Sequence, residues 1–305
     1  MWEACELKRA LRTTVVAVML VGVFVAGASL GGAVVAAPFE GTIVFMSTQD
    51  TGSWQVYRSN AQGWNVVRLT DTSASDAHPR ISPDGRQVVF ETTRDGRRNI
   101  YVMNIDGTGL RALTTVATED RHPAWSPDGR YIAFHSRYNG HDNWEIYTVA
   151  VDGTQMTRLT FSRGTSAWPS WSPDGRKIVF ASNRDGSYKL YLINADGTGE
   201  QQLTTGGGND EYPVWSPDGQ KIVFRSNRSG QYDIWVINAD GTGLTRLTDH
   251  PGEDTFPAWS PDGSKILFTT DRDGTQDIYM MDADGSNQVP WITGPAREAY
   301  ASWAP

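Results

Sequence analysis

Short apolar runs recur along most of the chain, separated by turns rich in Asp, Gly and Pro. In the unit from residue 254 to 293, Phe256–Trp259 is an apolar run that ends in S-P-D-G, a sequence typical of a type I turn. Lys265–Phe268, Asp277–Met281 and Trp291–Thr293 follow, separated by two Asp-Gly turns. This pattern predicts four short antiparallel strands joined by hairpins.

The pentapeptide W-S-P-D-G marks a repeat. Copies begin at Trp125, Trp171, Trp215 and Trp259, a further copy begins with Ile81 in place of Trp, and a truncated copy is Trp303-Ala304-Pro305. The successive steps are 44, 46, 44, 44 and 44 residues. A constant period of this size indicates a repeat architecture.

The predicted second and fourth strands each occur six times. The second strands are Ile43-Val44-Phe45, Val88-Val89-Phe90, Ile132-Ala133-Phe134, Ile178-Val179-Phe180, Ile222-Val223-Phe224 and Ile266-Leu267-Phe268; the fourth are Leu69-Thr70, Leu113-Thr114, Leu159-Thr160, Leu203-Thr204, Leu247-Thr248 and Ile292-Thr293. A first strand is missing before Gly41 but stands alone at the C-terminus.

One four-stranded sheet cannot bury two apolar faces by itself, whereas six sheets around an axis bury each face against a neighbour. We therefore predict an all-β fold, a six-bladed β-propeller over residues 41–305. The strand at 298–305 should complete the blade begun by residues 41–70 and so close the ring. An open solenoid is the structural alternative.

Composition and charge narrow the class. With 31 Gly, 12 Trp and 39% hydrophobic residues, the chain resembles a turn-rich all-β globular protein of one domain. Its net charge is −8; residues 1–37 carry three basic and two acidic residues, so the remainder carries −9. Such a surface repels phosphate backbones and argues against a nucleic-acid partner. Cys5 is the only cysteine, so disulfides and thiol chemistry are not expected in the repeats.

Residues 1–37 have the pattern of an export signal. Lys8, Arg9 and Arg12 precede residues 13–37, a stretch of 25 residues without a charge. We predict a signal peptide cleaved near residue 36 or 37, or a retained membrane anchor, since 25 uncharged residues could span a bilayer. In either case the repeats lie outside the cytoplasm, in the periplasm or the extracellular space.

The motifs W-S-P-D-G, I-V-F, D-I-Y, N-A-D-G-T-G and L-T resemble the WD40-like (PD40) repeats of the TolB family, over essentially all of residues 41–305. The resemblance implies a periplasmic propeller of the Tol-Pal envelope system. Similar repeats occur in prolyl oligopeptidase-like enzymes and some pectate-type lyases, so the fold alone does not assign a function. TolB itself carries an α/β domain ahead of its propeller, where this chain has about 40 mostly apolar residues.

The candidate ligand site consists of two sets of residues that precede the marker in each repeat. An aromatic or histidine ring lies three residues ahead of each Trp or Ile81: His78, His122, Trp168, Tyr212, Phe256 and Tyr300. A carboxylate lies five residues ahead in five of the six repeats: Asp76, Asp120, Asp210, Asp254 and Glu298, with Ser166 in the sixth. We expect an acidic circle and an aromatic circle at one channel mouth, where the carboxylates would repel one another and favour a cationic partner.

Structural roles are the alternative for these residues. Each Asp could cap a turn, and each ring could pack between blades. His78 and His122, beside Asp76 and Asp120, also form a possible metal site with two histidines and two carboxylates, although only two blades carry a His. Arg94, Arg184, Arg228 and Arg272 follow the second strands, and we expect each to hold its own hairpin by bonding a carbonyl or a carboxylate such as the neighbouring Asp. The marker tryptophans should pack between blades.

Residues 41–305 contain no G-x-S-x-G nucleophile motif. Our leading hypothesis is therefore a monomeric, non-enzymatic scaffold without a cofactor, which binds a protein or peptide in the cell envelope. The alternative is a metal-dependent lyase of acidic glycans that uses the channel mouth, although the acidic chain would repel uronates.

Overall fold

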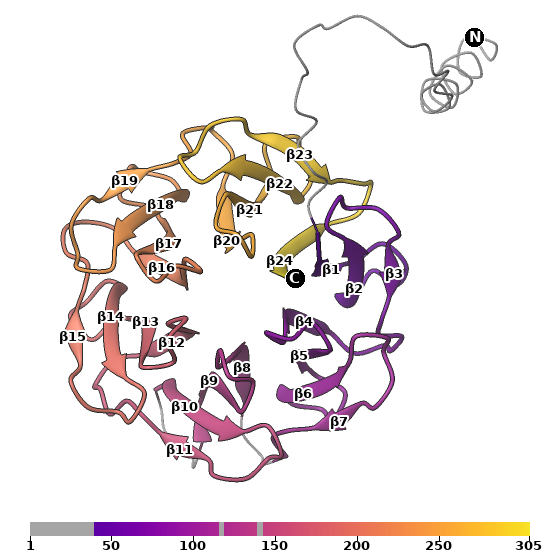
Figure 1. Cartoon of the computed structure of the whole chain (residues 1–305), viewed down its shortest axis with the longest axis horizontal. Helices are drawn as coiled ribbons and strands as arrows, with labels where there is room; N and C mark the ends of the chain where they lie inside the picture. Colours follow the sequence, from indigo (N-terminus) through magenta and orange to yellow (C-terminus); the bar gives the residue numbers. More distant parts are fainter. Residues whose placement is uncertain (1–39, 116–118, 139–142) are drawn as a thin grey trace, which may run out of the picture. The chain divides into compact units, whose positions relative to one another are not determined.

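The computed structural model describes residues 40–115, 119–138 and 143–305. These residues form six four-stranded antiparallel sheets arranged as blades around a central axis (Figure 1). The predicted six-bladed β-propeller is confirmed. The predicted signal peptide or anchor, with Cys5, lies outside the described residues. Within them, no helix is long and apolar enough to cross a membrane.

In each blade the four strands are ordered from the axis outward. The inner strands are β24 (Glu298–Ala304), β4 (Asp76–Ile81), β8 (Asp120–Trp125), β12 (Ser166–Trp171), β16 (Asp210–Trp215) and β20 (Asp254–Trp259). The second strands are β1 (Thr42–Ser47), β5 (Gln87–Thr92), β9 (Tyr131–Ser136), β13 (Lys177–Ser182), β17 (Lys221–Ser226) and β21 (Lys265–Thr270).

The third strands are β2 (Gln55–Asn60), β6 (Asn99–Asn104), β10 (Glu145–Ala150), β14 (Lys189–Asn194), β18 (Asp233–Asn238) and β22 (Asp277–Asp282). The outer strands are β3 (Val67–Arg68), β7 (Arg111–Ala112), β11 (Thr157–Arg158), β15 (Gln201–Gln202), β19 (Thr245–Arg246) and β23 (Val289–Ile292). We number the blades by their second strands, so that blade 1 contains β1 and blade 6 contains β21.

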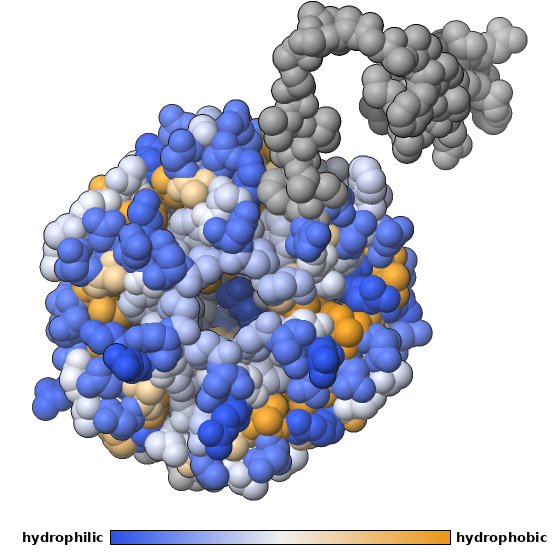
Figure 2. Space-filling view, in the orientation of Figure 1, coloured by the Kyte–Doolittle hydropathy of each residue, from blue (hydrophilic) through white to orange (hydrophobic). Residues whose placement is uncertain are grey.

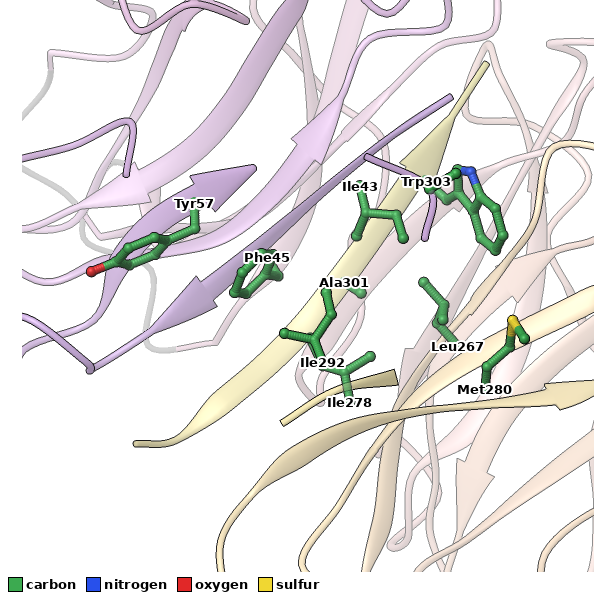
Figure 3. Close-up of a cluster of buried hydrophobic side chains, with 10 residues drawn as sticks. Ile43, Phe45, Tyr57, Leu267, Ile278, Met280, Ile292, Ala301 and Trp303 are labelled. Atoms are coloured by element: carbon green, nitrogen blue, oxygen red, sulfur yellow. The ribbon is translucent and has the colours of Figure 1, made fainter. Parts of the chain in front are cut away.

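Blade 1 combines both ends of the propeller. The C-terminal strand β24 pairs antiparallel with β1, and Trp303 lies opposite Ile43. Both residues join a buried cluster with Phe45 of blade 1 and Leu267 of blade 6 (Figure 3). The composite blade is therefore held by backbone pairing within its sheet and by apolar packing against the last blade, as the strand count predicted.

The marker tryptophans pack between neighbouring blades, as expected. Trp259 of blade 6 lies in one buried cluster with Val223 and Ile234 of blade 5. Its indole N–H donates to the carbonyl of Val214 at 3.3 Å, and Trp125 donates likewise to the carbonyl of Arg80 at 3.0 Å. Each of these two residues thus adds a directional hydrogen bond to its packing across the blade interface.

The L-T motif does not itself form the outer strand in blades 1 to 5, where the two strand residues come just before it. The backbone N–H of Leu69 still donates to Val56, while the hydroxyl of Thr70 accepts the N–H of Val56 at 3.0 Å. Equivalent bonds reach Thr114, Thr160, Thr204 and Thr248. The Thr hydroxyl therefore takes the place of the next backbone partner in the ladder, which explains the motif.

Candidate functional site

The six predicted ring residues share an unusual backbone conformation. His78, His122, Trp168, Tyr212, Phe256 and Tyr300 have φ angles between 50° and 56°. Each interrupts the pairing of its inner strand with the second strand, as in the shift between Ala77 and Arg80. The left-handed region costs a non-glycine residue about 1–2 kcal/mol, so six bulges with bulky side chains require compensation from tertiary contacts.

The six ring residues singled out from the sequence meet one another around the propeller axis. The His78 and His122 ring centroids are 3.7 Å apart, and Phe256 lies 4.8 Å from Tyr212 and 5.2 Å from Tyr300. Tyr212 and Tyr300, on either side of Phe256, are 6.5 Å apart. These are contact distances for aromatic rings, so the rings fill the middle of the channel.

Three of the bulges are held by a polar side chain of the preceding blade. The backbone N–H of His122 donates to Oε2 of Glu91 at 2.8 Å, that of Trp168 to Nδ1 of His135 at 3.3 Å, and that of Tyr300 to Oγ1 of Thr269 at 3.2 Å. The three acceptors all directly follow the Phe of a second strand. Because a bulge frees its N–H from the sheet, an acceptor from the preceding blade offsets part of the strain.

The carboxylate circle is not exposed at a channel mouth, contrary to the sequence-based expectation. Asp76, Asp120, Asp210, Asp254 and Glu298 are all 0–3% exposed. Arg94 pairs with Asp76, Arg228 with Asp210 and Arg272 with Asp254, at 2.7–3.1 Å. The hairpin arginines thus do bind carboxylates, but the partner lies 18 residues earlier in the chain and is not the neighbouring Asp. These ion pairs neutralise three of the five carboxylates and so reduce the expected repulsion.

Three blades depart from this ion pair. Blade 3 has Tyr138 at the position of the hairpin arginine, and there Asp120 accepts a hydrogen bond from Ser136. Blade 4 has Ser166 in place of the carboxylate, and there Arg184 pairs with Glu200 instead. Blade 1 has Gln49 where blades 2, 4, 5 and 6 have an Arg, and Glu298 accepts a hydrogen bond from Ser47 at 3.2 Å. Burial, together with the nearby Asp277 carboxylate, raises the pKa of Glu298 to about 7, in spite of the Ser47 hydrogen bond.

The two channel histidines meet a carboxylate that sequence reasoning missed. Nδ1 of His78 lies 3.1 Å from Oε2 of Glu91, and Nδ1 of His122 lies 3.8 Å from the same oxygen. Glu91 is fully buried, and its Oε1 pairs with Arg98 at 2.5 Å. Asp76 and Asp120, the carboxylates considered from the sequence, do not belong to this cluster. The signal for Glu91 was its place directly after the second-strand Phe, where the side chain reaches the bulge of the next blade.

The protonation of this cluster follows from burial and charge. Burial would raise the pKa of Glu91, but His78, Arg98 and the His122 N–H outweigh it and lower that pKa to about 2. Burial, with His78 and His135 nearby, holds the pKa of His122 well below its usual value. At neutral pH the cluster therefore contains a carboxylate and a neutral imidazole at His122.

The S-P-D-G turns lie together on one face of the ring, which we call the SPDG face. At its centre is a hollow of about 350 Å³, which we call the funnel (Figure 2). All six inner strands line it. Its walls include the marker Trp residues, the prolines of the turns and the C-terminal Pro305. This volume lies at the lower end of the range of ligand pockets, about 300–1,000 Å³.

Arg80 also lines the funnel, and it is the only charged side chain among the lining residues. The positions equivalent to Arg80 are occupied by small or apolar residues: Ala124, Ser170, Val214, Ala258 and Ser302. The guanidinium of Arg80 donates to the Tyr300 hydroxyl at 3.1 Å and lies 4.6 Å from the centroid of that ring. Among the described residues it has no carboxylate partner. The funnel thus presents one cation in an apolar setting.

A second pocket of about 220 Å³ is lined by blades 1, 2 and 6 and reaches the ring residues of blades 2 and 6. His78, Arg98, Phe256 and Arg297 line it, together with Trp54. It contains none of the residues that line the funnel. His78 is therefore accessible from a pocket separate from the SPDG face.

Comparison with known proteins agrees with this architecture. The structure is similar to TolB from Acinetobacter baumannii, with a TM-score of 0.79 and 22% identity over 88% of this chain and 68% of that one. A putative TolB from Agrobacterium tumefaciens gives 0.70 and 24%, over 88% of this chain and 100% of that one. An oligogalacturonate lyase from Vibrio parahaemolyticus gives 0.55 and 16%, over 84% and 75%. At these identities the similarity shows the fold alone.

No curated protein matches the sequence. The PD40 family model, described as the TolB beta propeller domain, matches residues 68–167, 162–235 and 212–305. These segments together cover more than half of the chain. The chain therefore belongs to the PD40 family of TolB β-propeller domains.

Proposed function

We propose that this chain is an exported scaffold that binds a partner protein through the SPDG face. The observation that carries the proposal is the funnel, which is built from equivalent positions on all six blades. The ring residues fill the channel, so a segment entering the funnel meets a floor and does not pass through. Such a geometry suits capture of a short chain segment or of one or two side chains.

The chemistry of the funnel specifies the segment. Trp and Pro side chains offer apolar contact, and Arg80 offers a guanidinium without a carboxylate partner. An acidic side chain or a C-terminal carboxylate with apolar neighbours would complement both features. We therefore propose that the partner presents a carboxylate, in place of the cationic partner expected from the sequence, because all five carboxylates of the circle are buried.

Export is the other part of the proposal. It rests on the basic and uncharged blocks of residues 1–37 and on membership of the TolB propeller family. We do not extend the lyase hypothesis to this chain, because the similarity to lyase structures carries the fold alone.

Site-specific photo-crosslinking in intact cells tests the proposal. Pro217 and Ser229 are exposed residues of blade 5: Pro217 lies in an S-P-D-G turn that lines the funnel, and Ser229 lies in the hairpin at the other end of the sheet. A photo-reactive residue at 217 should capture one envelope protein, and the same residue at 229 should not. Equal capture at both positions, or capture only at 229, would contradict the proposal.

A further inference from the structure

The cluster of His78, Glu91 and His122 contains buried nitrogen atoms without hydrogen-bond partners. His122 is 7% exposed, and neither of its ring nitrogens has a hydrogen-bond partner among the described residues. An imidazole buried in this way costs free energy unless another group binds it. His122 is also held in place, because its ring lies tilted against His78, with centroids 3.7 Å apart, and is stacked on His135 at 4.9 Å.

The ligand atoms are spaced for a metal ion. One atom from each of the three side chains lies within 4.8 Å of the others, and the two shortest separations to Glu91 are 3.1 and 3.8 Å. Ligands bound at about 2.0–2.1 Å in a tetrahedron stand roughly 3.3 Å apart. Small rotations of the imidazoles would therefore place all three atoms around one ion.

The backbone fixes this arrangement. His78 and His122 occupy the left-handed bulges of adjacent blades, with φ angles of 52° and 50°. The carboxylate of Glu91 is anchored on one side by Arg98 and on the other by the His122 N–H. Arg98 bonds Oε1, so Oε2 is the oxygen that faces the two imidazoles. Strain retained next to such a rigid set is typical of a functional site.

We propose that His78, His122 and Glu91 bind one divalent first-row transition-metal ion. Two imidazole nitrogens and one carboxylate oxygen suit Zn²⁺, Co²⁺ or Ni²⁺ and disfavour Ca²⁺ and Mg²⁺, which prefer oxygen ligands. The pocket of about 220 Å³ that contains His78 gives the ion a path from solvent. The remaining coordination positions are free for water. This site is separate from the funnel and does not depend on the proposed partner.

Equilibrium dialysis against Zn²⁺ and Co²⁺, after removal of bound metal with a chelator, tests the proposal. Wild-type protein should bind one ion per chain, and bound Co²⁺ should show the intense visible absorption of a low-coordinate site. His78→Phe and His122→Phe keep a ring in the channel, as Phe256 does in blade 6, and each should reduce the affinity at least 100-fold. Glu91→Gln should also reduce it.

Exposed His250 provides the matched control. His250→Ala removes a histidine that does not belong to the channel cluster and should leave both stoichiometry and affinity unchanged. Melting curves establish that each variant is folded, and Glu91→Gln serves as the second test if a Phe variant unfolds. The proposal is overturned if wild-type protein binds no stoichiometric metal, or if folded His78→Phe and Glu91→Gln proteins bind as wild type does.

Discussion

Nη2 of Arg228 lies 2.7 Å from both carboxylate oxygens of Asp210. Asp210 is fully buried and also accepts a hydrogen bond from Ser226 at 2.6 Å. The pair joins the inner strand of blade 5 to the hairpin between its second and third strands. The carboxylate circle therefore acts as a set of internal braces for the blades.

Removing one member of this brace should destabilise the fold. Asp210→Asn leaves the guanidinium of Arg228 largely buried without its counter-charge, and we expect a loss of about 2–4 kcal/mol in the free energy of unfolding. Urea denaturation measures it. The double variant Asp210→Asn with Arg228→Met is the control and should recover part of the loss. A single variant as stable as wild type would show that the pair does not brace the blade.

Replacing Glu298 by a neutral residue should stabilise the fold, in contrast to Asp210→Asn, because blade 1 has Gln49 in place of the arginine. The pKa of Glu298 is raised to about 7 from an ordinary value near 4.5. The folded state thus binds its proton more tightly than the unfolded state, and the stability from this group is lost as pH rises between these values. The free energy of unfolding of Glu298→Gln should therefore rise by about 1–2 kcal/mol relative to wild type between pH 4.5 and 8.

Denaturation of both proteins across this pH range checks the prediction. The difference in free energy of unfolding should grow with pH and level off above about pH 7. A constant difference would mean that Glu298 titrates as it does in the unfolded chain.

Ring closure through β24 should dominate stability. Deleting residues 299–305 removes Tyr300 and Trp303, both at most 8% exposed, and leaves β1 without its inner partner. Large-to-small changes at buried aromatic residues cost about 3–5 kcal/mol each, so we expect a loss above about 5 kcal/mol. Thermal melting measures it. A truncated protein that melts within a degree or two of wild type would contradict the closing role.

The left-handed bulges make a further prediction at Phe256, whose φ is 51°. Both Phe256→Ala and Phe256→Gly lose the ring, but only glycine adopts this conformation without strain. Phe256→Gly should therefore be more stable than Phe256→Ala by about 1 kcal/mol. At Ala258 in the same strand, where φ is not positive, substitution by glycine should instead destabilise. If Phe256→Ala were instead more stable than Phe256→Gly, as is usual within strands, the bulge at position 256 would not be strained.

Much of the fold follows from the sequence because each repeat carries its own turn motifs and apolar runs. The first blade lacks its inner strand before Gly41, and an extra inner strand stands alone at the C-terminus. This pattern predicts the composite blade. The bulges could not be predicted, since the local sequence around His78 or Tyr212 carries no glycine signal for a positive φ. The ion pairs were missed because an Asp lies next to Arg94, Arg184 and Arg272 in sequence, whereas the carboxylate partners of Arg94, Arg228 and Arg272 are 18 residues away. Glu91 joins the histidines only through contact between two blades.

The central claim, binding through the SPDG face, depends on Arg80. Once the protein captured at position 217 is identified, its affinity for three propellers decides the matter: wild type, Arg80→Lys and Arg80→Met. Because a hydrogen bond to a charged group contributes about 1.5–3 kcal/mol, Arg80→Met should weaken binding at least tenfold, while Arg80→Lys should retain part of it. Equal affinity for wild type and a folded Arg80→Met protein would contradict recognition of a carboxylate in the funnel.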